Sequence, residues 1–170
     1  ADVQLTCVTA PGTGKDHSWI AIIAAQASPV FAALTDYARP VVSSIERPSE
    51  PGVLVVDLAT SGNDAVRIFG RNFGDSTAKV NQVMYGKTGV EYTATSCVIA
   101  VAHERIDCRS APGAGTDHTW HVVVDGQEST NPLSGYGQPY IREITPTSRL
   151  TPMGGTRVAL RGNNLGVAQD

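Results

Sequence analysis

The sequence predicts an all-β protein, and its composition and an internal repeat carry that prediction. Its 170 residues include 17 Gly and 10 Pro, which indicate frequent turns. Ser, Thr and Val are abundant, and long helical patterns are missing, a balance typical of all-β chains. Charged residues make up 17% of the chain, which is low for a free-standing cytosolic domain.

Charge and hydropathy exclude two classes of function. The net charge is −3, and no Lys/Arg cluster marks a basic face, so we expect no nucleic-acid partner. The longest apolar run is 19–25, far too short to cross a bilayer. We therefore expect no membrane insertion.

A repeat is the strongest signal in the sequence. The segment 5–19 returns as 106–120 without a gap, at an offset of 101 positions. Eight residues of the first copy recur at the same places in the second: Cys7, Ala10, Pro11, Gly12, Gly14, Asp16, His17 and Trp19. A match this dense indicates duplication.

A second block repeats at smaller offsets. Residues 37–40 return as 136–139, an offset of 99 positions, and 66–74 return as 158–166, an offset of 92. The middle copy therefore carries about seven extra residues, which we place in 51–61. The expected layout is a partial domain, a complete domain and a second partial domain. Residues 1–38 form the C-terminal half of one domain, 39–138 a complete domain, and 139–170 the N-terminal part of a third.

The two partial copies lack the equivalents of residues 79–101. The complete copy is large enough to bury a stable core, and each half is not. Its expected strands are 41–45, 53–58, 65–69, 80–85, 91–97, 98–102, 119–124 and a last strand ending at Tyr136. Asp125-Gly126 predicts a hairpin turn.

Alternation along 119–124 places Trp120, Val122 and Val124 on one face of a strand, which we expect to face the core. The N-terminal partial copy places Trp19, Ala21 and Ile23 at the same positions. The expected core of the repeat, over all copies, consists of Trp19, Trp120, Val122, Val66, Ile68, Val158 and Leu160.

These motifs resemble the IPT/TIG family, immunoglobulin-like domains shared by plexins, growth-factor receptors and some transcription factors. The resemblance rests on 37–40 leading into Val41, Val42 and Ile45, on 66–74 and 154–166, on the Cys-x-x-Ala-Pro-Gly-x-Gly segments at Cys7 and Cys108, and on the turn before Gln127. The departures are 62–64, where the family usually shows Gly-Gly-Thr, and the insertion at 51–61. The resemblance implies tandem immunoglobulin-like β-sandwiches that serve binding and architecture, with no catalysis and no cofactor.

The resemblance also implies a disulfide between Cys97 and Cys108, and two buried free thiols are the alternative. Cys7 matches Cys108, and the match to Cys97 falls in the missing equivalents of 79–101. Cys7 is therefore expected to be unpaired in this chain. Its partner was either removed or lies in another chain.

Asp16-His17 and Asp117-His118 are the only hint of acid–base chemistry. A catalytic triad also needs a nucleophile held by that His, and nothing marks the neighbouring Ser18 or Thr119 as activated. The simpler interpretation is a turn Asp and a His that enters a strand before a core Trp. The four His, which include His103 and His121, show no metal-ligand spacing. We expect no catalytic residue and no metal site.

Other polar and aromatic residues have structural explanations too. Arg71-Asn72 and Asn163-Asn164 lie beside glycines and predict turns with positive φ, with a ligand role as the alternative. Tyr85, Tyr92 and Tyr140 can stack on sugars if they are exposed. No Asn-linked sequon occurs. Ser/Thr-linked glycans remain open at Ser28, Thr35, Ser129 or Thr130.

Half sandwiches expose unpaired strand edges, and such edges recruit other strands. A head-to-tail contact between identical chains is heterologous and gives a fibre if it does not close. We therefore expect a structural protein of an extracellular filament or cell-surface stalk, with identical or similar repeats as partners through strand addition. Alternatively, the 170 residues are a part of one long polypeptide of many repeats, in which the covalent chain itself joins the repeats into an elongated structure. The alternatives are a receptor or adhesion ectodomain that binds a protein or glycan, and an accessory domain of an enzyme.

Overall fold

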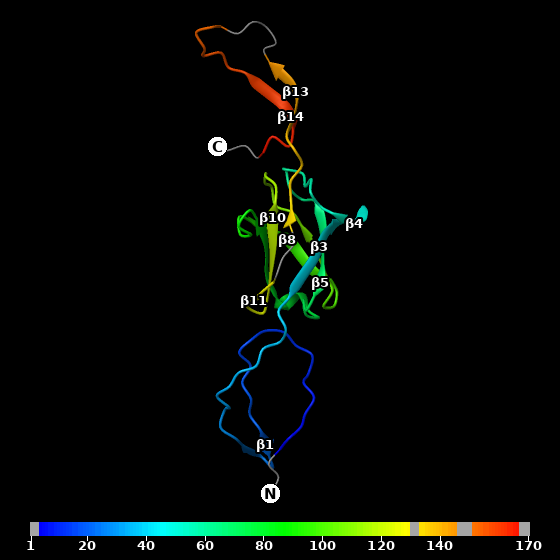
Figure 1. Ribbon diagram of the computed structural model, residues 1–170, viewed down its shortest axis with the longest axis vertical. Helices are drawn as coiled ribbons and strands as arrows, with labels where there is room; N and C mark the ends of the chain where they lie inside the picture. Colours follow the sequence, from blue (N-terminus) through cyan, green and yellow to red (C-terminus); the bar gives the residue numbers. More distant parts are fainter. Residues whose placement is uncertain (1–3, 130–132, 146–150, 167–170) are drawn as a thin grey trace.

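The computed structural model describes residues 4–129, 133–145 and 151–166. Within these ranges the chain contains strands, turns and one 3-10 turn, η1 (Thr77–Lys79), and no α-helix. The all-β prediction is confirmed. The molecule is elongated, with a compact central body and a smaller segment projecting from each end (Figure 1).

Two antiparallel sheets form the central body. The first has the order β4 (Glu50–Leu54), β3 (Val41–Arg47), β5 (Ala65–Arg71), β9 (Arg105–Arg109) and β8 (Thr95–Val101). The second has the order β11 (Gln127–Glu128), β10 (His118–Val124), β6 (Val80–Gly86) and β7 (Tyr92–Thr93), and β12 (Leu133–Ser134) also pairs with β10. Buried side chains from both sheets form a single core, as in a β-sandwich.

Alternation along β10 builds one wall of this core. Trp120, Val122 and Val124 are buried, whereas the residues between them are only partly so, as predicted. The indole of Trp120 stacks on the ring of Tyr85 from β6, with centroids 4.2 Å apart. The predicted hairpin follows, because Asp125 has a φ of 47° and the next residue is a glycine at 78°.

Three parts of the sheets differ from the sequence prediction. The separate strands expected at 91–97 and 98–102 are wrong in their bounds, because β7 covers only Tyr92–Thr93 and β8 continues from Thr95 to Val101. The strand β9, at an inner position of the first sheet, was missed, although Ile106 and Cys108 alternate there with charged residues. The strand expected at 53–58 is wrong in its bounds. The edge strand β4 ends at Leu54, and the chain then turns inward because Val55 and Leu58 are buried in the core.

A short hairpin lies in each flanking segment. The N-terminal segment, residues 4–38, carries β1 (Ile22–Ile23) and β2 (Gln26–Ala27). The C-terminal segment, residues 139–166 as far as they are described, carries β13 (Tyr140–Thr145) and β14 (Ala159–Asn163). We call these the head and the tail. They lie at opposite ends of the central body (Figure 1).

Candidate functional site

The head is held together by the same hydrogen bonds as residues 105–137 of the central body. In each, an indole N–H donates to a hydroxyl, a Tyr hydroxyl donates to an Ala carbonyl, and a backbone N–H donates to a Ser hydroxyl. The matched bonds are Trp19 to Thr35 (2.9 Å) and Trp120 to Ser134; Tyr37 to Ala10 (2.6 Å) and Tyr136 to Ala111 (3.0 Å); Ala21 to Ser28 (3.1 Å) and Val122 to Ser129 (2.9 Å).

The tail hairpin has the same register as the β3–β5 pair. The Cα partners in the tail are Tyr140–Asn163, Ile141–Gly162, Glu143–Arg161, Ile144–Leu160 and Thr145–Ala159. Those in the central body are Val41–Arg71, Val42–Gly70, Ser44–Phe69, Ile45–Ile68 and Glu46–Arg67. Both pairs carry a register shift after the second partner. The local geometry of each end therefore matches a defined part of the central body.

The ends and the central body differ in how far their apolar side chains are buried. Four members of the predicted core, Trp120, Val122, Val66 and Ile68, are at most 1% exposed. The other three are not core residues within this chain, since Trp19, Val158 and Leu160 are 42%, 43% and 49% exposed. The reason is that neither end has an opposing sheet. No described residue stacks on Trp19 as Tyr85 stacks on Trp120.

Each end consequently presents large apolar side chains to solvent. In the head these are Leu5, Val8, Trp19, Ile20, Ile22, Ile23, Val30, Phe31 and Leu34, and in the tail Tyr140, Ile141, Ile144, Met153, Val158, Leu160 and Leu165. Large apolar side chains gathered at the surface mark interaction sites. The two ends are the candidate functional site.

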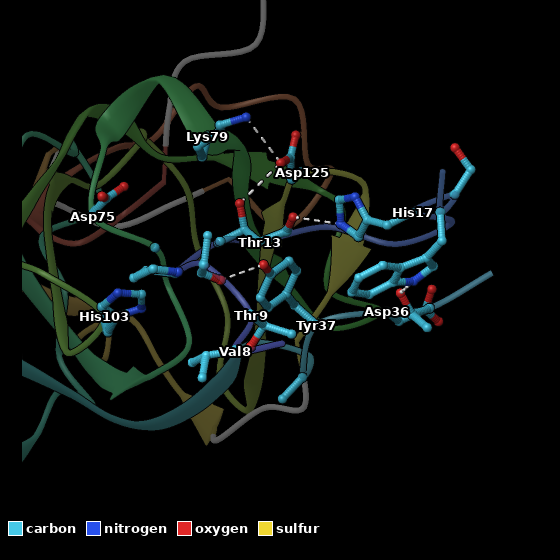
Figure 2. A pocket seen from close by; sticks show the side chains of 18 residues that line it. Val8, Thr9, Thr13, His17, Asp36, Tyr37, Asp75, Lys79, His103 and Asp125 are labelled. Carbon is cyan, nitrogen blue, oxygen red and sulfur yellow. Dashed lines mark hydrogen bonds and ion pairs between the residues drawn. The ribbon is translucent and has the colours of Figure 1, made fainter. Parts of the chain in front are cut away.

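A shallow pocket lies where the head meets the central body (Figure 2). Asp125 anchors it, because one carboxylate oxygen accepts a hydrogen bond from the Thr13 hydroxyl (3.0 Å) and lies 3.2 Å from the Lys79 ammonium. The Thr13 bond, together with the Lys79 bond, lowers the pKa of Asp125. The amide of Gln127 also donates to the Tyr37 carbonyl, at 3.0 Å. These contacts attach the head to the body.

The two Asp-His pairs have structural surroundings. A ring nitrogen of His17 lies 3.1 Å from the Thr13 carbonyl, and the backbone N–H of Asp16 donates to Asp36 (2.8 Å). His118 is buried, with its ring against the edges of Tyr92 and Tyr136 at 5.5 and 5.0 Å. Burial lowers the pKa of His118. Among the described residues, no hydrogen bond joins either His ring to a carboxylate or to a side-chain hydroxyl.

A tyrosine cluster around His118 escaped the sequence prediction. The hydroxyls of Tyr85 and Tyr136 lie 2.7 Å apart, and burial raises the pKa of both groups. Tyr85 is fully buried and is not available to a sugar, and the partly buried ring of Tyr92 packs against Tyr85 and Tyr136. Tyr140 remains exposed. The recurrence of Tyr37 as Tyr136 is the feature of the sequence from which part of this cluster could have been predicted.

The Asn turns are as predicted. Asn72 and Asn164 have φ of 64° and 55°. Their side-chain amides donate to the carbonyls of Arg39 (2.9 Å) and Gln138 (3.2 Å), respectively. Each Asn thus ties the end of a hairpin to the residue two positions before its first strand, which explains the turn without a ligand. In the described part of the chain, no three His, Cys, Asp or Glu side chains are grouped as metal ligands.

Cys97 and Cys108 form a disulfide, as expected, and Cys7 is free and exposed. Disulfides persist in oxidising compartments, so the bond favours a location outside the reducing cytosol. The candidate glycan hydroxyls of Ser28 and Thr35 are hydrogen bonded and that of Ser129 is buried. Thr130 lies outside the described residues.

No family model, curated protein or solved structure matches the chain. The described residues contain no helix long and apolar enough to span a membrane.

Proposed function

We propose that this chain is a non-catalytic structural unit of an extended extracellular filament or surface stalk. Its head and tail are incomplete immunoglobulin-like domains of the IPT/TIG type, each completed by matching strands of a neighbouring repeat. The neighbour is a second copy of the chain, and repeated addition of copies gives a linear array.

One observation carries this proposal. The head and tail already hold the hydrogen bonds and strand register of the central body, yet the side chains that should fill their cores are exposed. Burial of apolar surface contributes about 25 cal/mol of stabilising free energy per Å². Completion of each half sandwich by a neighbour is therefore favourable. Because the two ends lie on opposite sides of the body (Figure 1), completion extends the assembly along one axis.

Electron microscopy of the purified chain tests the proposal. We expect continuous fibres, and we expect Trp19→Asp to abolish them because it places a charge in the apolar face of the head. Val53→Asp is the matched control, since it places the same charge on an exposed apolar residue of β4 in the central body, outside both ends. Discrete particles for the unaltered chain would contradict the filament and favour a receptor or adhesion module that binds a protein or glycan.

A further inference from the structure

One strand edge of the tail lacks the partner that its equivalent has. In the central body, β5 pairs with β3 on one side and β9 on the other. In the tail, β14 pairs with β13, and among the described residues nothing pairs with its second edge. The segment that matches β9 by repeat is 4–8 of the head. This segment has no strand partner within the described chain.

We propose that β14 of one copy pairs antiparallel with residues 4–8 of a second copy, in the register of β5 with β9. This inference rests on the proposed function and names the contact that performs it. In the central body the Cα partners are Ala65–Arg109, Val66–Cys108, Arg67–Asp107, Ile68–Ile106 and Phe69–Arg105. The repeat offsets convert them to Arg157–Val8, Val158–Cys7, Ala159–Thr6, Leu160–Leu5 and Arg161–Gln4.

The side chains suit this register. Ile68 and Ile106 lie opposite each other and are fully buried in the core. Their equivalents, Leu160 and Leu5, are 49% and 72% exposed in the isolated chain. Pairing them recreates an apolar cross-strand pair, the unit that stabilises an antiparallel sheet. Cys7 then shares the inward face with Leu5, as Cys108 does with Ile106.

The charges of the two ends are complementary. Residues 1–38 contain three Asp and one Lys, a net charge of −2, and residues 139–170 contain four Arg, one Glu and one Asp, a net charge of +2. Opposite charge favours a head against a tail, whereas two heads or two tails repel each other. A head-to-tail contact leaves one free head and one free tail after each addition, so growth continues.

A single substitution tests the register. Val158→Cys places a thiol directly opposite the native Cys7 of the next copy. Under mild oxidation with copper phenanthroline, we expect a ladder of dimers, trimers and longer species on a non-reducing gel. The unaltered chain stops at dimers, because Cys7 is its only free thiol. Ala159→Cys is the matched control, since its side chain points to the opposite face of the sheet.

The outcomes separate the register from the filament. A ladder for Val158→Cys that is absent for Ala159→Cys, and is lost when Cys7→Ser is added, supports the pairing. Equal ladders for both variants, or none for Val158→Cys, overturn it. If the unaltered chain still forms fibres in that case, the filament stands with another contact. If it forms none, both proposals fail. Leu5→Cys with Leu160→Cys, in a Cys7→Ser background, provides a second pair in the same register.

Discussion

Trp120 and Trp19 have the same local structure and opposite surroundings. Each indole donates to a hydroxyl of the returning chain. Trp120 is fully buried against Tyr85, whereas Trp19 is 42% exposed. The difference shows that local sequence is enough to set hairpin geometry, and that burial needs the opposing sheet. Stability in this molecule should therefore be concentrated in the central body.

The largest expected effect comes from removing the two indoles in turn. Trp120→Ala leaves a cavity at the centre of the core and should lower the free energy of unfolding by about 3–5 kcal/mol. Trp19→Ala should change the stability of the central body by less than about 0.5 kcal/mol, as expected for substitutions away from a core. Denaturant unfolding monitored by near-UV circular dichroism measures both. Equal losses would show that the head and body unfold as one unit.

The disulfide gives the next effect. Replacing Cys97 and Cys108 together by Ala should cost about 2–3 kcal/mol, because the bond closes a loop of 11 residues in the unfolded chain. Cys7→Ser is the control at the equivalent position of the head, and it should leave the unfolding midpoint unchanged. Thermal unfolding of the double and single variants makes the comparison. A midpoint shift for Cys7→Ser would contradict the separation between the head and the central core.

The sequence predicted the repeat positions and most strands, because alternation and turn residues are local signals. The β10 face and the Asp125 turn are of this kind. The inward turn of Val55 and Leu58 was not predictable, because it depends on a distant partner. Leu58 pairs with Tyr136 in an isolated bridge across the body. The exposure of Leu160 escaped prediction for the same reason, since its local sequence matches that of a core strand.

The two Asp-His repeats should differ in their response to acid. Burial lowers the pKa of His118 below its ordinary value of 6.5. The folded state then binds fewer protons than the unfolded chain, so stability falls as pH drops through and below 6.5. His118→Phe should flatten the loss of stability between pH 7 and pH 5, while His17→Phe, at the exposed equivalent site, should leave it unchanged. Unfolding curves at several pH values measure the slopes. An unchanged slope in His118→Phe would assign the acid sensitivity to other groups.

The smallest effect concerns the attachment of the head to the body. Asp125→Asn removes the charge that Lys79 meets and keeps a residue type that tolerates positive φ. The pair is solvent-exposed, so its loss should cost below about 1 kcal/mol and leave the central body as stable as before. The Thr13 hydroxyl keeps only a weaker, neutral acceptor. The backbone amide of Tyr37, which donates to the Gly14 carbonyl (3.0 Å), should therefore exchange hydrogen faster in Asp125→Asn, while the amides of β10 stay protected. Unchanged exchange at the Tyr37 amide would mean that the Gln127 bond to the Tyr37 carbonyl is sufficient to hold the head.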